Sequence, residues 1–158
     1  MPLTRHILSL LAVVTSLVAL PALRADQGEI IRELDAPSVE QILAAMKMDY
    51  TQIKPGIYSF SLGGYKTLLF NKGKNIQFYA SFKKRVPLTR INEWNAGKRY
   101  TRAYLDKDGD PVLEADLDLE GGVSPRALLE FIKMWVTSVQ LFTQHIGFQS
   151  GSATGSGA

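Results

Sequence analysis

The stretch GIYSFSLGGYKTLLFNKGKNIQFYASF, residues 56–82, decides the fold of this chain. It contains three short runs rich in aromatic and β-branched residues, which the turn sequences GG and NKGKN separate. Runs of this kind with period-two alternation are typical of half-buried antiparallel strands. The stretch therefore predicts a three-stranded meander with strands at 56–62, 65–70 and 76–82.

Helical patterns stand on both sides of this meander. In APSVEQILAAMKMDY, Ser38 and Gln41 have the spacing of a capping box, and the apolar residues that follow recur at helical intervals. This segment predicts a helix over 38–48. After the meander, PLTRINEWNAG predicts a second, short helix over 87–97, because Asn95 and Gly97 are typical stop signals.

The remainder of the chain predicts a hairpin and a long helix. KRYTRAYL and PVLEADLDL flank an Asp-Gly turn, and SPRALLEFIKMWVTSVQLFTQHIG follows. Ser124 suits the N-cap, Pro125 the first helical position and Gly147 the stop, which predicts a helix from Pro125 to Ile146. The order α-β-β-β-α-β-β-α indicates an α+β fold in which an antiparallel sheet packs against helices.

The first 25 residues have the pattern of a cleavable signal peptide. Arg5 and His6 precede ILSLLAVVTSLVAL, and Pro21 and a small-residue exit follow. A membrane-spanning helix needs about 20 apolar residues, which this run does not reach. We therefore expect a periplasmic or secreted protein with no stable membrane insertion after cleavage. The expected organisation is signal peptide 1–25, lead-in 26–36, domain 37–147 and disordered tail 148–158.

Composition excludes several kinds of chemistry. Cleavage would remove Arg5 and Arg24 from the 18 Lys and Arg residues, leaving 16 against 15 acidic residues, a net charge near +1 that favours no nucleic-acid partner. The sequence has no cysteine, so it forms no disulfide and has no thiol nucleophile. His145 is the only histidine after the signal peptide. It stands at the end of the last predicted helix, where we expect it to meet the last carbonyls of that helix. No cofactor and no enzymatic activity are predicted.

The segment AYLDKDGDPVLEADLDLEGGV, residues 103–123, holds seven carboxylates between Asp106 and Glu120. A helix-loop-helix calcium loop counted from Asp106 would need glycine where Pro111 stands and glutamate where Leu117 stands. Alternation of apolar and acidic residues over 113–120 favours a strand with a charged, solvated outer face. A metal- or ligand-responsive sensor that uses the acidic hairpin 106–120 is the alternative, and a two-carboxylate hydrolase is a weaker one.

The charges also suggest a register for the hairpin. A loop over Asp108–Asp110 would place Arg102 opposite Asp116 and Lys98 opposite Glu120, and cross-strand opposite charges favour register. A two-residue loop would instead place Arg102 opposite the apolar face of its partner strand. The first register is therefore expected. The basic run FKKRVP, residues 82–87, indicates either a solvated strand end or a patch for an anionic surface.

The last helix carries more apolar surface than one sheet face needs. One stripe of apolar residues covers the sheet, and Leu129, Ile132 and Val136 widen it into a second. Either the short helix near 88–96 covers the remainder, or the exposed strip is a contact site. We expect partner binding at Trp135, Val139 and Phe142, with a second copy of the chain or a client protein as the partner.

The segment INEWNAGKRYTRAYLDKDGDPVLEADLDLEGGVSPRALLEFI, residues 91–132, resembles the YbjN-like family of bacterial sensory transduction regulators. The matching elements are the Trp94-Asn95 pair, the aromatic-x-x-Ala-Tyr-Leu run from Tyr100, the acidic turn, the strand from Leu113 to Asp118 and the GGVS before the long helix.

The resemblance implies a fold like that of type III secretion chaperones, with the same element order. It also implies a binding or regulatory module without known catalysis, and it supplies no functional residues. The signal peptide sets this chain apart from cytoplasmic relatives. We therefore expect an exported, non-catalytic protein-interaction or regulatory module, with envelope sensing or chaperone-like binding as its role.

Overall fold

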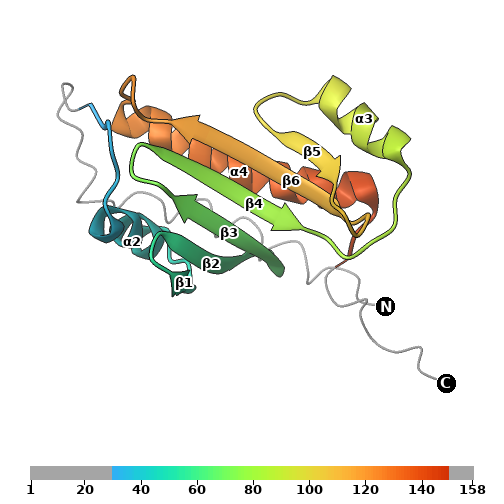
Figure 1. The fold of residues 1–158 in the computed structure, drawn as a ribbon, viewed down its shortest axis with the longest axis horizontal. Helices are drawn as coiled ribbons and strands as arrows, with labels where there is room; N and C mark the ends of the chain where they lie inside the picture. The colour runs from blue at the N-terminus through green and yellow to red at the C-terminus, as the bar shows by residue number, and fades with distance from the viewer. Residues whose placement is uncertain (1–29, 150–158) are drawn as a thin grey trace, which may run out of the picture.

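The computed structural model describes residues 30–149, which form one antiparallel sheet with helices packed on one of its faces (Figure 1). The predicted signal peptide 1–25 lies outside the described residues. The helices are α2 (Ala36–Ala45), α3 (Leu88–Gly97) and α4 (Pro125–Ile146). No helix among the described residues is long and apolar enough to cross a membrane.

The sheet has six strands in the spatial order β1-β2-β3-β4-β6-β5. The strands are β1 (Tyr50–Lys54), β2 (Ile57–Leu62), β3 (Tyr65–Asn71), β4 (Asn75–Ser81), β5 (Arg102–Leu105) and β6 (Pro111–Asp118). The α+β class is confirmed, and the predicted meander of three strands has a fourth, β1, at its start. The sequence of β1 shows no alternation because four of its five residues are exposed at the sheet edge.

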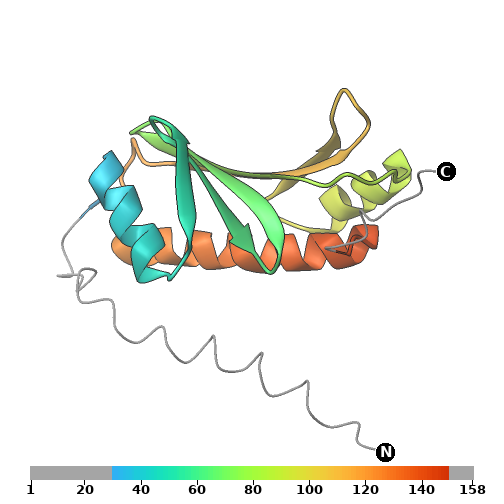
Figure 2. The same ribbon diagram turned by 90° about the horizontal axis from the view of Figure 1, so that it is seen from below.

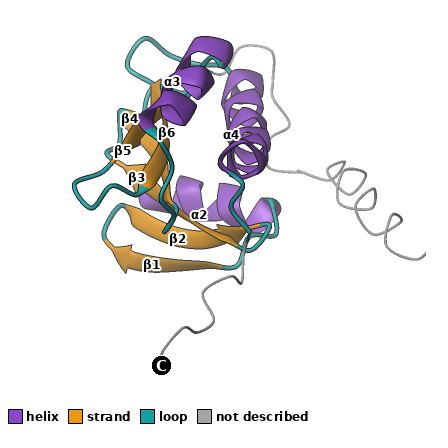
Figure 3. Cartoon of the chain, turned by 90° about the vertical axis from the view of Figure 1, so that its right-hand side faces the viewer, coloured by secondary structure: helices purple, strands orange, loops and turns teal. Residues whose placement is uncertain are grey.

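The long helix α4 builds the core against the inner face of the sheet. Figure 3 shows the sheet curving around this helix. Trp135 stacks on Phe78 of β4 with ring centroids 5.4 Å apart and planes 10° apart. The predicted bounds of α4 are confirmed, with Ser124 accepting a hydrogen bond from the amide of Ala127 and Gly147 ending the helix in a left-handed conformation.

Helix α2 begins two residues earlier than predicted, because its N-cap is Asp35 and not Ser38. The Asp35 carboxylate accepts a hydrogen bond of 2.9 Å from the Ser38 amide, and hydrogen bonding with Ser38 lowers the pKa of Asp35. A carboxylate at this position also interacts favourably with the positive end of the helix dipole.

The ordered domain extends beyond the predicted limits 37–147. Within the predicted lead-in, Ile31 forms an antiparallel bridge with Val123, and Leu34 is buried in the core. At the other end, Phe148 packs against the rings of Tyr65 and Phe82. Residues 150–158 of the predicted tail lie outside the described residues.

The predicted register of the β5–β6 hairpin is wrong by two residues. Arg102 lies opposite Glu114 and not Asp116, and Leu105 lies opposite Pro111. The predicted pairing of Glu120 with Lys98 is also wrong, because Glu120 forms an ion pair of 3.2 Å with Lys74. A shift of two residues leaves every side chain on its predicted face, since side chains alternate with period two.

A longer loop, residues 106–110, causes this shift. One carboxylate oxygen of Asp106 accepts hydrogen bonds of 2.9 Å from the amides of Asp108 and Asp110. The amide of Asp106 also donates to the carbonyl of Asp110, and Gly109 in the turn has a φ of +76°. An aspartate that binds amides further along the loop stabilises the turn without help from cross-strand charges.

Helix α3 packs along the outer edge of β5. The side-chain amide of Asn95 donates to the carbonyl of Ala103 and accepts from its amide, both at 2.9 Å. The indole of Trp94 donates to the hydroxyl of Thr101, which fixes the chain between helix and strand. The Trp94-Asn95 pair of the sequence thus closes one of the two edges of the sheet.

Candidate interaction surface

All described helices lie on the inner side of the sheet, and the outer side bears none, as the edge-on view shows (Figure 2). We call this outer side the helix-free face. Strand register and alternation define its side chains. They include Thr51, Lys54, Ile57, Ser59, Ser61, Lys66, Leu68, Phe70, Asn75, Gln77, Tyr79, Ser81, Arg102, Tyr104, Val112, Glu114, Asp116 and Asp118.

Large apolar and aromatic groups occupy the middle of the helix-free face. Leu68 and Phe70 of β3 and Tyr79 of β4 are each half-buried, although no helix covers them. The rings of Phe70 and Tyr79 meet edge to face, with centroids 6.3 Å apart. A contiguous apolar strip on an exposed sheet face is typical of a contact surface.

Beside this strip, Glu114 is buried, which corrects its predicted place on a solvated face. The side chain of Glu114 is only 8% exposed, because Arg102 and Tyr104 of the neighbouring strand cover it. Arg102 forms an ion pair and a hydrogen bond with one carboxylate oxygen. The hydroxyl of Tyr104 donates to the other oxygen at 2.6 Å.

These contacts fix the protonation of the two residues that cover Glu114. Burial raises the pKa of Tyr104, and its hydrogen bond to the Glu114 carboxylate raises this pKa further. The hydrogen bond to Glu114 likewise raises the pKa of Arg102. Tyr104 therefore remains a donor and Arg102 remains a cation, with both carboxylate oxygens occupied. This cluster stabilises the β5–β6 pairing and leaves no free group for acid–base chemistry.

The remaining carboxylates of the acidic hairpin also have structural roles or point to solvent. The Asp118 carboxylate accepts a hydrogen bond of 2.9 Å from the amide of Glu120, and that of Asp106 closes the loop. Between residues 30 and 149, no three histidine, cysteine or acidic side chains are placed so that they could hold a metal ion. The Asp106 and Asp118 carboxylates of the hairpin thus bind backbone amides of nearby residues and stabilise its turns.

His145 meets a different carbonyl from those we predicted. Its Nε2 lies 2.7 Å from the carbonyl oxygen of Arg90 in α3, and its ring lies 5.7 Å from that of Trp94. The last turn of α4 is thereby joined to α3. Its imidazole thus has a neighbouring helix as its partner.

The basic run 82–87 is mostly engaged within the chain. Lys84 donates to the carbonyl of Gly147 at the end of α4, and Arg85 donates to the carbonyl of Asp108 in the hairpin loop. These contacts join the β4–α3 connection to two distant segments. They favour the structural interpretation of the run over an anionic-surface patch.

The residues predicted to bind a partner lie in the core. The exposed fraction is 0% for each of Trp135, Val139 and Phe142. A partner that binds the protein in this conformation therefore cannot touch these side chains. The expected cover from the short helix is present over part of α4, since Trp94 of α3 meets the ring of Phe142 at 5.0 Å. Partner binding through these three residues stays a prediction that would require α4 to move.

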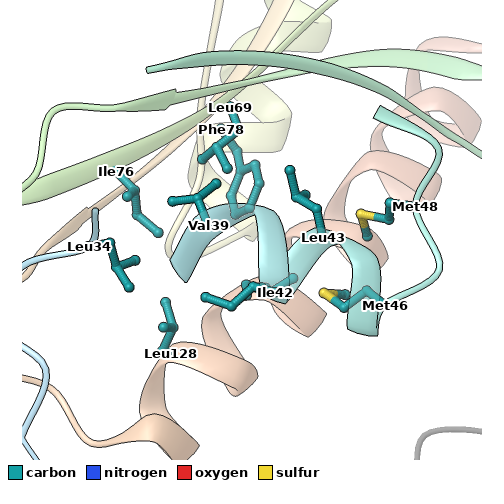
Figure 4. A pocket seen from close by; sticks show the side chains of 11 residues that line it. Leu34, Val39, Ile42, Leu43, Met46, Met48, Leu69, Ile76, Phe78 and Leu128 are labelled. Carbon is teal, nitrogen blue, oxygen red and sulfur yellow. The ribbon is translucent and has the colours of Figure 1, made fainter. Parts of the chain in front are cut away.

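A small cavity lies between α2, α4 and the sheet (Figure 4). It has a volume of about 20 Å³, and only apolar side chains line it, with Met46 and Met48 on one side. A volume of this size holds about one water molecule, and an apolar lining offers a water no partners. The cavity is therefore a packing defect and not a ligand site.

The sequence carries a signal for the helix-free face, although we did not predict a contact surface there. In YKTLLF, Thr67 and Leu69 face the core, so Leu68 and Phe70 occupy positions that a solvated face would give to polar residues. Tyr79 repeats this departure in the next strand. Apolar residues on both faces of a strand indicate that both faces make contacts.

Comparison with known proteins gives one result that covers most of the chain. The sequence model of the YbjN family, described as "Putative bacterial sensory transduction regulator", matches residues 35–148. This match spans every helix and strand described above. No curated protein sequence matches the chain.

Proposed function

The chain belongs to the YbjN family, and on this basis we propose that it is an exported regulatory protein that acts by protein–protein association and not by catalysis. The helix-free face is the observation that carries the proposal. It presents Leu68, Phe70 and Tyr79 on rigid, hydrogen-bonded strands, where a contact costs little ordering of the backbone.

The arrangement of polar groups supports a binding role. Glu114, the most buried acid among the described residues, has both oxygens engaged by Arg102 and Tyr104. His145 is joined to the backbone of α3. A general acid or base must reach a substrate proton, and a carboxylate with both oxygens engaged cannot do so without breaking those contacts.

Export is the second part of the proposal, and it rests on the sequence of residues 1–25. An apolar run of signal-peptide length follows Arg5 and ends before Asp26. We expect the protein isolated from its host envelope to begin near Asp26. Intact-mass measurement tests this expectation, and an envelope protein that retains Met1 would contradict it.

Site-specific crosslinking tests the binding role. A photoreactive phenylalanine analogue placed at Tyr79 should form covalent products with another protein in intact cells. The same analogue at Arg126, an exposed residue of α4, is the matched control and should give none. Equal products at both positions, or none at position 79, would rule out association through the helix-free face.

A further inference from the structure

The charged side chains of the helix-free face that form no ion pair among residues 30–149 are Lys54, Lys66, Asp116 and Asp118, and two of them, Lys66 and Asp116, lie next to the apolar strip. Lys66 of β3 and Asp116 of β6 are both exposed, and none of the ion pairs in this part of the chain includes either of them. They flank the apolar strip on opposite sides. A surface with an apolar middle and charged flanks resembles an interface core with a polar rim.

The strand register places these charges symmetrically about Tyr79. Leu68 of β3 lies directly opposite Tyr79 of β4. Lys66 is two residues from Leu68 on β3, so it lies one strand to one side of Tyr79 and two residues along the strand direction. Asp116 of β6 lies directly opposite Gln77, which is two residues before Tyr79 on β4. Asp116 is therefore one strand to the other side of Tyr79 and two residues away in the opposite strand direction. With strands about 4.8 Å apart and a rise of about 3.4 Å per residue, each charge is roughly 8 Å from Tyr79 along one diagonal.

We propose that a second copy of this chain covers the helix-free face, with the two-fold axis passing between the two Tyr79 side chains. The proposal rests on the proposed function and names the partner of that surface. A two-fold interface is self-complementary, so a contact between Lys66 of one copy and Asp116 of the other occurs twice. The diagonal placement of the two charges meets this requirement.

The same axis determines how the two sheets cross. An axis perpendicular to the line from Lys66 to Asp116 makes the strands of the two copies cross at roughly 70°, given the strand spacing and rise. Near-perpendicular crossing is one of the two arrangements in which twisted sheets pack face to face. Leu68 lies directly beside Tyr79, between the two charged contacts, where its apolar surface leaves water.

The size of the face indicates a reversible dimer. Five spacings between the six strands give a width of about 24 Å, and the seven-residue strands β3 and β4 give a length of about 23 Å. The resulting area of about 550 Å² per copy is an upper limit, because the sheet curves around α4 and the helix-free face is its convex side, and it is smaller than the roughly 800 Å² of a standard interface. We therefore expect monomer and dimer to interconvert with protein concentration.

A charge exchange between copies tests this geometry. Lys66→Glu sets two acids against each other across the axis, and Asp116→Lys sets two cations against each other. Sedimentation velocity should show a concentration-dependent dimer for the unmodified residues 26–158 and at least tenfold weaker dimerisation for each variant. Mixing the two variants should restore dimerisation. In the mixed dimer, the two introduced side chains attract each other at one contact, and the unchanged Lys66 and Asp116 attract each other at the other.

Controls separate this result from misfolding and from a general charge effect. Arg126→Glu makes the same change of charge as Lys66→Glu but on α4, and it should dimerise like the unmodified protein. Circular dichroism should show the same melting temperature for all dilute variants within about 3 °C, because exposed charges contribute little to stability.

Three outcomes would overturn the proposal: a strictly monomeric protein at all concentrations, single variants that dimerise normally, or a mixture that does not recover. If the protein is monomeric yet position 79 crosslinks to another protein, the proposed function stands and only this inference fails. If position 79 crosslinks solely to a second copy, the dimer stands and the regulatory role loses its support.

Discussion

Asn95 of α3 hydrogen-bonds both the amide and the carbonyl of Ala103, as a residue of an additional strand would. One side chain thus occupies the outward-facing backbone groups of β5 at this position. At the opposite edge, β1 has an irregularity between Gln52 and Lys54. Capped and irregular edges both discourage unwanted strand pairing, which favours the proposed contact through the helix-free face over pairing at a sheet edge.

Asn95→Ala should lower the free energy of unfolding by about 1–3 kcal/mol, because it leaves a buried amide and a carbonyl without partners. Asn92→Ala in the same helix is the control, since Asn92 is exposed and its loss should cost less than about 0.5 kcal/mol. Urea unfolding measures both values. Faster hydrogen exchange at the Ala103 amide in the Asn95 variant alone would identify the cause, and equal effects of the two substitutions would contradict it.

Glu114→Ala should destabilise the β5–β6 hairpin by about 1–3 kcal/mol, because Tyr104 and Arg102 lose their acceptor. Asp116→Ala on the same strand removes an exposed carboxylate, and in dilute protein it should change stability by less than about 0.5 kcal/mol. Chemical denaturation of both variants provides the comparison. A Glu114 variant as stable as the Asp116 variant would mean that the buried cluster contributes nothing.

Stability in alkali should depend on Tyr104. Its pKa in the folded protein is raised above the ordinary value of about 10, so its contribution is present below pH 10 and is lost as the pH rises above it. Tyr104→Phe should therefore flatten the decline of unfolding free energy above pH 10 by up to about 1.4 kcal/mol per pH unit. Denaturant titrations from pH 8 to 11 measure this difference, and identical slopes would refute it.

Filling the cavity beneath α2 should stabilise the protein. Val39 lines the cavity, and Val39→Ile adds one methylene group to it, which should raise the free energy of unfolding by about 0.8 kcal/mol. Val139 is fully buried and does not line the cavity, so Val139→Ile should overpack the core and cost about 1–3 kcal/mol. Thermal unfolding should show a higher melting temperature for Val39→Ile and a lower one for Val139→Ile.

Local signals predicted α4 well because its limits depend on neighbouring residues alone, Ser124 at one end and Gly147 at the other. Strand β1 could not be found this way, since an exposed edge strand carries no alternation. The prediction of the hairpin register failed because the hydrogen bonds from two backbone amides to the Asp106 side chain set the length of the loop. Cross-strand charge pairs, on which the prediction relied, contribute less than about 1 kcal/mol each.

The candidate surface depended on tertiary information that single positions do not carry. The apolar stripes of α4 correctly indicated extensive contacts, but the sheet curves around the helix and Phe78 of β4 stacks on Trp135, which is buried within the chain. Glu114 gave no sign of burial, because its neighbours Arg102 and Tyr104 are fixed only by the register.

The stacking of Trp135 on Phe78 sets the order in which a newly made chain can be completed. Strand β6 pairs with β4, although α3 and β5 separate these two strands in the sequence. The inner face of the sheet is then covered by α4, which is formed by the last residues of the domain. A nascent chain that ends before Ser124 exposes Phe78 and Ile76 on a bare sheet. Exposed apolar surface of this kind favours aggregation, so we expect the chain to be most prone to aggregate before α4 has been synthesised.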